Sequence, residues 1–294
     1  MLSKRMKLHV IEPHGFCSGV KNAVKTAKST LLSFPGERVY CLHELVHNEI
    51  VINELNSLGM ITVDTIDEIP DGSRVLFSAH GVSPQVREIA ERKNLKVIDT
   101  TCPFVSRVHR EALSAAIEGK NVIVIGESKH VEVQGVVGEI IKVGGTYIVV
   151  KTIDDVLSIN WDKNTDIRIV VQTTLSEDDV VTVIEAIKNK FPNTETSMAS
   201  SVCTATHDRQ KAVRDFVSDS LNNGAKKVGV LVLGSVKSAN TNRLLQIAQE
   251  AGAKAWRCAS EEEIKNIDFS DIDILGVTAG ASTPESLFNA TSDI

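Results

Sequence analysis

Aromatic residues are scarce in this chain of 294 residues, and no long apolar run interrupts it. Phe, Trp and Tyr together make up 4% of the sequence, too few for a platform on which nucleic-acid bases could stack. The net charge is -6, so no basic excess is present to follow a phosphate backbone. No apolar stretch approaches the length that crosses a membrane. We therefore expect neither nucleic acid nor a membrane as a partner.

A secretory signal is also missing. The basic N-terminus, residues 1–7, leads into a short strand-like run and a loop with Pro and Gly, not into an apolar stretch. We therefore expect a cytoplasmic protein, in which disulfides are improbable. Metal binding or catalysis is then the alternative to burial as small apolar residues for the cysteines. There are five of them: Cys17, Cys41, Cys102, Cys203 and Cys258.

The chain contains one order of predicted elements, repeated three times. In each copy a cysteine precedes an amphipathic helical run, which is followed by an apolar strand, a polar loop, a helix and a second apolar strand. The first strands are residues 39–42, 122–125 and 228–233, and the second are residues 75–77, 169–171 and 275–277. Length alone suggests roughly two domains. The repeated order predicts three units instead, at residues 1–100, 101–200 and 201–294.

The alternation of strands and helices predicts an α/β fold with parallel sheets. Ligands of such sheets gather beyond the carboxyl ends of the strands, where every polar loop of the repeat lies. If the three units pack around a threefold axis, three cysteines and their polar loops converge on one centre.

Cys17, Cys102 and Cys203 occupy the same place in the three copies. Each stands just before a helix, where free N–H groups and the helix dipole favour a thiolate. Structural zinc sites normally draw on close Cys pairs and add a fourth ligand, whereas three distant thiolates suit a 4Fe-4S cluster with one open iron. A three-cysteine zinc enzyme and three small buried residues stay as alternatives. Cys41 and Cys258 have no counterparts, and we interpret them as core or surface thiols.

His130 and Glu132 follow the apolar strand of the middle copy. If strand geometry persists through them, alternate side chains share a face and both point into one cavity. A carboxylic acid near a bound anion and a reduced cluster would have a raised pKa and could deliver a proton. The alternative is a solvated loop after a strand.

The other loops carry neutral or switchable hydrogen-bond donors, which suit an anion with many oxygens such as a diphosphate. These candidates are His47, His80, His130, Thr173, Ser238, Asn240 and Ser282. A lone histidine is more often structural, and we interpret five of them in that way: His9, His14, His43, His109 and His207.

Nine short motifs, all in order, resemble the 4-hydroxy-3-methylbut-2-enyl diphosphate reductase family, and the resemblance runs from about residue 9 to residue 286. They are Gly-Phe-Cys-Ser-Gly-Val at 15–20, Leu-Val-His-Asn at 45–48, Phe-Ser-Ala-His-Gly-Val-Ser at 77–83, Asp-Thr-Thr-Cys-Pro at 99–103, His-Val-Glu at 130–132, Gln-Thr-Thr-Leu-Ser at 172–176, Cys-Thr-Ala-Thr at 203–206, Ser-Ala-Asn-Thr-Asn-Arg at 238–243 and Gly-Val-Thr-Ala-Gly-Ala-Ser at 276–282. The resemblance covers nearly the whole chain.

The resemblance implies a trefoil of three α/β units around a 4Fe-4S cluster held by Cys17, Cys102 and Cys203. It implies reductive removal of the allylic hydroxyl of the diphosphate substrate, giving isopentenyl and dimethylallyl diphosphates, with a reduced ferredoxin- or flavodoxin-type protein as electron donor. Glu132 would be the proton source. The seven donor residues named above would line the diphosphate and hydroxyl end of the substrate.

Three positions depart from the family pattern. Val131 replaces the usual proline before Glu132, Ala239 replaces a serine, and His207 with Asp208 stands where uncharged polar residues are usual. The loss of one hydroxyl at Ala239 would weaken substrate binding by roughly 1 kcal/mol. An iron-sulfur sensor or binding protein without turnover is the competing class, but a sensor needs neither an open iron nor an adjacent acid.

Overall fold

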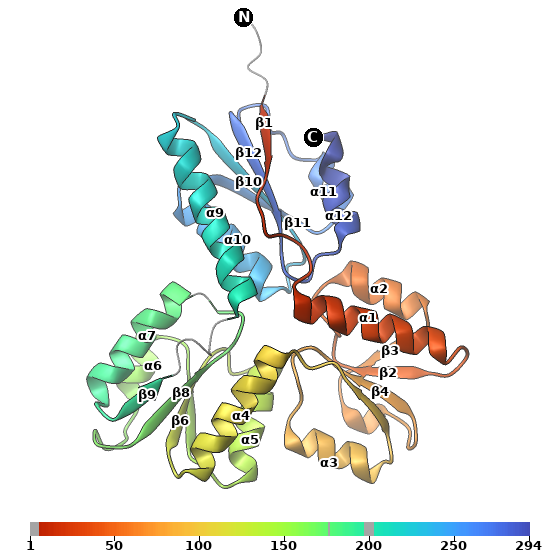
Figure 1. Ribbon diagram of the computed structural model, residues 1–294, viewed down its shortest axis with the longest axis vertical. Helices are drawn as coiled ribbons and strands as arrows, with labels where there is room; N and C mark the ends of the chain where they lie inside the picture. The colour runs from red at the N-terminus through yellow and green to blue at the C-terminus, as the bar shows by residue number, and fades with distance from the viewer. Residues whose placement is uncertain (1–5, 176, 197–202) are drawn as a thin grey trace, which may run out of the picture. The chain divides into compact units, whose positions relative to one another are not determined.

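The computed structural model describes residues 6–175, 177–196 and 203–294 of the chain (Figure 1). These residues form three sheets, each of four parallel strands, with helices between the strands. The predicted α/β class with three parallel sheets is therefore confirmed. The chain divides into two compact units. The first contains residues 1–21, 47–51 and 204–294, and the second contains residues 22–46 and 52–203.

Two of the sheets belong to the second unit. One has the strand order β3-β2-β4-β5, and the other has the order β7-β6-β8-β9. Their strands are β2 (Val39–Leu42), β3 (Met60–Val63), β4 (Arg74–Phe77), β5 (Lys96–Asp99), β6 (Asn121–Ile125), β7 (Tyr147–Val150), β8 (Ile167–Val171) and β9 (Thr194–Thr196). The helices along this stretch of chain are α1 (Ser18–Ser33), α2 (Glu49–Ser57), η1 (Ile66–Glu68), α3 (Pro84–Arg92), α4 (Pro103–Ile117), α5 (Val131–Lys142), α6 (Ile153–Ser158) and α7 (Glu177–Lys190).

The third sheet belongs to the first unit and has the order β1-β12-β10-β11. It contains β1 (Lys7–Val10), β10 (Val228–Leu233), β11 (Lys254–Cys258) and β12 (Ile274–Ala279). The helices are α9 (Thr204–Asn222), α10 (Ala239–Glu250), α11 (Glu261–Lys265), α12 (Glu285–Asn289) and η2 (Ala290–Asp293). Starting from its other edge, this sheet has the order β11-β10-β12-β1. Each strand then corresponds in position to one strand of the orders β3-β2-β4-β5 and β7-β6-β8-β9.

The N-terminal strand β1 therefore supplies the fourth strand of the sheet built by the last third of the chain. It pairs with β12 in parallel, from Lys7 opposite Ile274 to Val10 opposite Val277. In the other two sheets the fourth strands are β5 and β9, which come directly before the segments of Cys102 and Cys203. The fourth strand of every sheet thus leads into a cysteine. The predicted unit boundaries near residues 100 and 200 stay a prediction.

The central strands are buried on both faces because helices cover both sides of each sheet. Along β6, Ile123 and Ile125 pack with residues of α6 and α7, whereas Val122 and Val124 pack with α4 and α5. Side chains alternate between the two faces of a strand, so a strand covered on both sides is apolar at every position. Strand β10 follows the same rule. This double burial fixes the strand ends from which the polar loops emerge.

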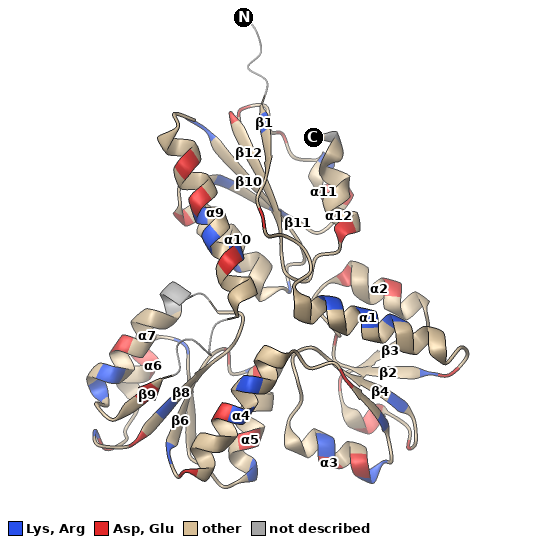
Figure 2. Ribbon diagram, in the orientation of Figure 1, with Lys and Arg blue, Asp and Glu red and all other residues tan. Residues whose placement is uncertain are grey.

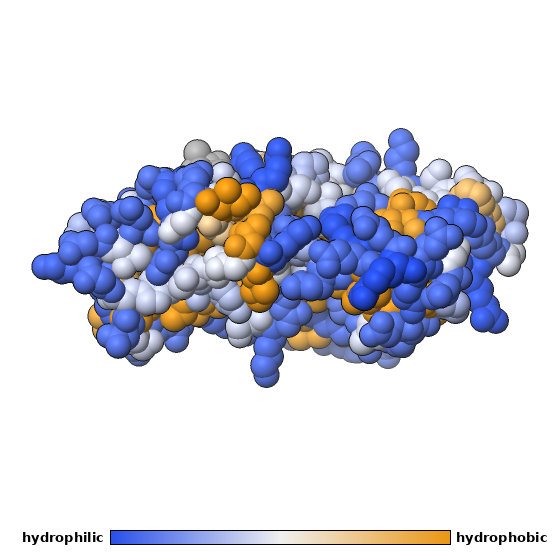
Figure 3. Space-filling model, turned by 90° about the horizontal axis from the view of Figure 1, so that it is seen from below, coloured by the Kyte–Doolittle hydropathy of each residue, from blue (hydrophilic) through white to orange (hydrophobic). Residues whose placement is uncertain are grey.

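The surface carries mixed charges. Figure 2 shows Lys and Arg interspersed with Asp and Glu along helices such as α3, α4 and α9. On the face shown in Figure 3, hydrophobic residues form small separate patches among hydrophilic ones. No described helix has the length and apolar character needed to cross a membrane.

Candidate active site

The three repeated cysteines lie at helix starts, as the sequence predicts. Cys17 directly precedes α1, Cys102 is the N-cap residue of α4, and Cys203 directly precedes α9. All three side chains are partly exposed and form no disulfide. The backbone N–H of Val20, in the first turn of α1, donates to the Cys17 Sγ at 3.4 Å. Such N–H groups stabilise a thiolate.

One backbone hydrogen bond recurs at all three cysteines. The N–H of Cys17 donates to the Ala281 carbonyl at 3.0 Å, and the N–H of Cys102 donates to the Ala79 carbonyl at 3.0 Å. The N–H of Cys203 donates to the Thr173 carbonyl at 3.5 Å, the longest of the three. Each acceptor lies two residues beyond the strand next to the sheet edge. Every cysteine is therefore tied to the polar loop of its own sheet in the same way.

The other two cysteines differ from these three. Burial raises the pKa of the Cys41 thiol to about 12 and that of Cys258 to about 11, and Glu263 adds to the rise at Cys258. A buried thiol that keeps its proton is a poor metal ligand. This result agrees with the interpretation that they have no role in the site.

The three candidate ligands are divided between the two units. Cys17 lies in the first unit, and Cys102 and Cys203 lie in the second. Within the described part of the chain, no group of three or more His, Cys, Asp or Glu side chains is gathered at one point. What supports a shared cluster is therefore that the three thiols have the same local setting.

The structure corrects the sequence analysis on how His130 and Glu132 are placed. Strand β6 ends at Ile125, and Glu132 lies in the first turn of helix α5, so strand alternation does not align the two side chains. His130 is the N-cap residue, and its Nδ1 accepts a hydrogen bond from the Glu132 backbone N–H at 3.2 Å. This cap starts the helix and ends the extended conformation.

Glu132 is buried, with 1% of its surface exposed. Its carboxyl accepts a hydrogen bond from the Thr173 backbone N–H at 2.7 Å and another from the Thr173 hydroxyl at 3.1 Å. Burial raises the pKa of Glu132 to about 7, against the opposing effects of the Thr173 bonds and of His109. The sequence analysis expected a raised pKa from a bound anion and a cluster, whereas here burial alone is sufficient.

Two histidines are in contact near the start of α5. The rings of His80 and His130 meet edge to face, with centroids 5.7 Å apart. The Nδ1 of His80 lies 3.4 Å from the Ser78 hydroxyl, on the loop that follows β4. Four of the predicted site residues, namely His80, His130, Thr173 and Glu132, are therefore linked by contacts within the second unit.

The other four predicted residues lie in the first unit. The Ser282 hydroxyl donates to the backbone carbonyl of His47 at 3.1 Å. Ser238 is the N-cap of α10, and its hydroxyl accepts from the Thr241 N–H at 3.3 Å. Asn240 lies in the first turn of α10 and is 4% exposed. Neither its amide nitrogen nor its amide oxygen has a hydrogen-bond partner among the described residues.

Two glycines bring backbone close to the start of α10. A Cβ at Gly280 would lie 2.0 Å from the Thr241 hydroxyl, and one at Gly234 would lie 2.6 Å from the hydroxyls of Thr241 and Thr283. Neither contact is possible for a real side chain. The loops after β10 and β12 can therefore pack onto the helix start that carries Asn240 only because both positions are glycine.

The comparisons with known proteins agree with this geometry. The LytB protein family matches residues 8–294 of the chain. The 4-hydroxy-3-methylbut-2-enyl diphosphate reductase of Actinobacillus succinogenes is 40% identical over 282 residues, which cover 96% of this chain and 87% of the relative. The protein of the same name from Pseudoalteromonas translucida is 41% identical over 283 residues, covering 96% and 89%. The chain belongs to the LytB protein family.

Two solved structures share the fold of this LytB family member. The E-1-hydroxy-2-methyl-but-2-enyl-4-diphosphate reductase from Plasmodium falciparum matches with a TM-score of 0.90 and 34% identity, covering 98% of this chain and 87% of that one. A second structure, titled as the terminal enzyme of the non-mevalonate pathway, matches with a TM-score of 0.70 and 30% identity, covering 99% and 100%. The family resemblance predicted from the nine motifs is confirmed, and these relatives are named as reductases.

The sequence analysis missed residues that support the site in this LytB family member. Arg209 of α9 is 4% exposed and donates to the carbonyls of Gly15 and Ala205, both at 2.7 Å. It thereby ties α9 to the loop before Cys17. No sequence signal marks it, because an arginine within a helix is usually a surface residue.

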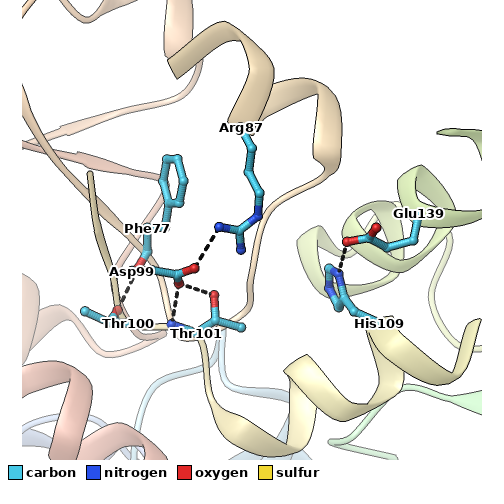
Figure 4. Close-up of polar contacts among 7 residues, drawn as sticks. All are labelled: Phe77, Arg87, Asp99, Thr100, Thr101, His109 and Glu139. Atoms are coloured by element: carbon cyan, nitrogen blue, oxygen red, sulfur yellow. Dashed lines mark hydrogen bonds and ion pairs between the residues drawn. The ribbon is translucent and has the colours of Figure 1, made fainter. Parts of the chain in front are cut away.

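A second support holds the loop before Cys102. The Asp99 carboxylate accepts from the Thr101 N–H at 2.9 Å and from the Thr101 hydroxyl at 2.5 Å, and pairs with Arg87 at 2.8 Å (Figure 4). The partners of Asp99 outweigh its partial burial and lower its pKa. The signal available in the sequence was the spacing of Asp99 two residues before Thr101, which is typical of a side chain that caps a turn.

Proposed function

We propose that the chain reduces 4-hydroxy-3-methylbut-2-enyl diphosphate to isopentenyl and dimethylallyl diphosphates. Two electrons and two protons enter for each substrate molecule. The allylic C–O bond breaks, the hydroxyl leaves as water, and one C–H bond forms on the allylic carbon skeleton. Membership of the LytB protein family supports this proposal, since relatives about 40% identical over nearly the whole chain carry that reductase name.

A 4Fe-4S cluster held by Cys17, Cys102 and Cys203 is part of the proposal. The donor set fits this group, because all three thiols form no disulfide, are partly exposed and are placed at helix starts, whereas Cys41 and Cys258 are buried. Three thiolates leave one iron of a cubane open. When bound, the cluster supplies the electrons and a Lewis-acidic iron for the substrate hydroxyl.

Glu132 is the proposed proton donor. Its pKa of about 7 keeps a substantial fraction of the carboxyl protonated at neutral pH, which suits a general acid. The hydroxyl of Thr173 and the imidazole rings of His80 and His130 lie next to it or are linked to it. These groups can orient the carboxyl proton toward the leaving hydroxyl.

Residues of the first unit are proposed to bind the diphosphate. The orphaned amide of Asn240 and the Ser238 hydroxyl lie at the start of α10, where free N–H groups attract anions. Ser282 and His47 are joined to each other on neighbouring loops. A bound phosphate oxygen would supply the hydrogen-bond partner that the buried Asn240 amide lacks.

The remaining expectations belong to the same proposal. The electron donor is a reduced ferredoxin- or flavodoxin-type protein, the reaction takes place in the cytoplasm, and the chain consists of three repeated α/β units. The proposed bounds of these units are residues 1–100, 101–200 and 201–294.

One observation carries the proposal. In a chain whose relatives are named for this reduction, a fully buried carboxyl with a pKa of about 7 lies at the helix start next to His130. Burying a carboxyl in this way has a cost in stability, which a proton-transfer role explains.

The test begins with anaerobic purification and analysis of iron, acid-labile sulfide and zinc. We expect about four irons and four sulfides per chain, and formation of both diphosphate products from the substrate with a chemical reductant. One zinc per chain without sulfide would contradict the cluster. A full cluster without any turnover would instead favour a sensor or binding protein.

A further inference from the structure

His109 differs from the structural histidine that its isolated position in the sequence suggests. It lies on α4, and its Nδ1 is 3.0 Å from the Glu139 Oε1 on α5 (Figure 4). The two side chains are 9% and 15% exposed. An imidazole whose Nδ1 faces a carboxylate has a fixed ring orientation, with its Nε2 directed away from that carboxylate.

The opposite edge of this ring is unusual. Nε2 of His109 is buried and has no hydrogen-bond partner among the residues that the structure describes. Two glycines make room for it: a Cβ at Gly135 would lie 3.0 Å from Nε2 and 2.9 Å from Cε1, and a Cβ at Gly81 would lie 3.1 Å from Nε2. A buried polar atom without a partner is destabilising, so its presence calls for an explanation.

The position of Gly135 shows which face of α5 the ring packs on. Glu132, Gly135 and Glu139 are spaced at i, i+3 and i+7 on α5, so they share one face of the helix. The ring lies against Gly135, which is three residues from Glu132 on this face, and bonds to Glu139. Burial raises the pKa of Glu132, and Coulombic attraction to His109 is among the effects that oppose the rise.

We propose that the buried His109–Glu139 pair acts through Glu132, keeping this carboxyl acidic enough to release its proton to the substrate. Glu139 orients the ring, and the ring, when protonated, favours the ionised carboxyl. A buried acid with no such neighbour holds its proton too tightly to be an efficient donor at neutral pH. His109 is thus a positioning residue, and its role rests on the proposed function of Glu132 as the acid.

Other charged groups lie on the two helices that pack against α5: α4 also carries Arg107, Arg110 and Glu111, and α3 carries Arg87, Glu88, Glu91 and Arg92. Helix α4 packs on α5, β6 and β8. Strand β6 has no charged residue, and Arg168 of β8 pairs with Glu195. On α5 the remaining charge is Lys142, which lies 3.8 Å from Glu88 of α3. His130 is the other titratable group in contact with Glu132.

The deciding variant is His109→Asn, whose amide nitrogen can replace Nδ1 as donor to Glu139 while Nε2 is removed. Infrared titration of the anaerobic holoprotein follows the Glu132 carboxyl, identified by its loss in Glu132→Gln. We expect the midpoint of this band to move to higher pH by about one unit in His109→Asn. The alkaline limb of the turnover profile should move with it, while KM stays unchanged.

Substitutions at Glu139 test the orientation of the ring separately. Glu139→Gln keeps an oxygen that can accept from Nδ1 and should retain a midpoint closer to that of the natural chain. Glu139→Leu removes the acceptor and should reproduce the upward shift. Lys142→Gln is the matched control, because it removes a charge from the same helix three residues further on. It should leave the midpoint where it is.

An unchanged Glu132 midpoint in both His109→Asn and Glu139→Leu would overturn the proposal, even if turnover fell. So would an equal shift in Lys142→Gln, which would indicate a general effect of charge. The infrared midpoint does not depend on turnover. If the natural chain held its cluster but left the diphosphate unreduced, the proposed function would fail while the link between His109 and Glu132 would still be decided.

Discussion

Glu132→Gln removes the proposed proton donor but keeps the shape of the site. Glutamine has nearly the same size as a protonated glutamic acid and can still accept the Thr173 N–H, which bonds to the carboxyl at 2.7 Å. It cannot give up a proton as the C–O bond breaks. General acid catalysis typically contributes about a hundred- to ten-thousand-fold, so the turnover number should fall within that range while substrate affinity changes by less than about tenfold.

The same substitution should stabilise the protein at alkaline pH. The pKa of Glu132 is raised from 4.5 to about 7, so the folded chain binds this proton more tightly than the unfolded chain. Stability is therefore lost as pH rises from 4.5 to about 7 and does not return above it. At about 1.4 kcal/mol for each pKa unit, the loss reaches about 3 kcal/mol as an upper limit.

The assay compares denaturant unfolding of Glu132→Gln and the natural chain near pH 4.5 and near pH 8. Turnover and substrate binding to the oxidised cluster are followed separately. We expect equal stabilities at the lower pH and a more stable variant at the higher pH, together with the loss of turnover. Near-normal turnover would refute the role of Glu132 as acid and direct attention to His130. A variant with no gain in stability at pH 8 would refute the raised pKa.

Three further sets of substitutions test the site. Cys17→Ser, Cys102→Ser or Cys203→Ser should each lose the cluster and the activity, whereas Cys41→Ser and Cys258→Ser should keep both; a full set of irons in Cys102→Ser, measured with sulfide, would contradict the ligand assignment. Asn240→Ala should raise KM by about tenfold or more with little change in unfolding free energy, because its amide has no partner to lose; an unchanged KM would exclude it from diphosphate binding. Gly280→Ala should cost about 1–3 kcal/mol through overpacking against Thr241 and also raise KM, whereas Gly36→Ala, where nothing lies within 4 Å, should leave KM unchanged.

The central strands and their polar loops could be predicted because double burial makes a strand apolar at every position. Strands β2, β6 and β10 were found in this way. Apart from the short strand-like run at β1, the edge strands were missed. Strand β5 is largely exposed and β9 has only three residues, so neither shows a continuous apolar run. Short edge strands are specified by their neighbours more than by their own sequence.

The placement of Glu132 illustrates a different limit. A spacing of two residues in H-x-E suits a strand, but the Nδ1 of His130 caps a helix whose first turn contains the acid.

The pairing of β1 with β12 links residues more than 260 positions apart, and no local sequence pattern predicts it. His109 was likewise interpreted as structural, since neither its contact with Glu139 nor its unpaired Nε2 is visible in the sequence.

The most direct measurement is the reduction of 4-hydroxy-3-methylbut-2-enyl diphosphate by the anaerobic protein with a measured excess of chemical reductant, in which products and consumed electrons are counted together. We expect isopentenyl and dimethylallyl diphosphates with two electrons used for each molecule formed, and neither product from Cys102→Ser. Substrate recovered intact from a protein that holds about four irons per chain would contradict the proposed reduction.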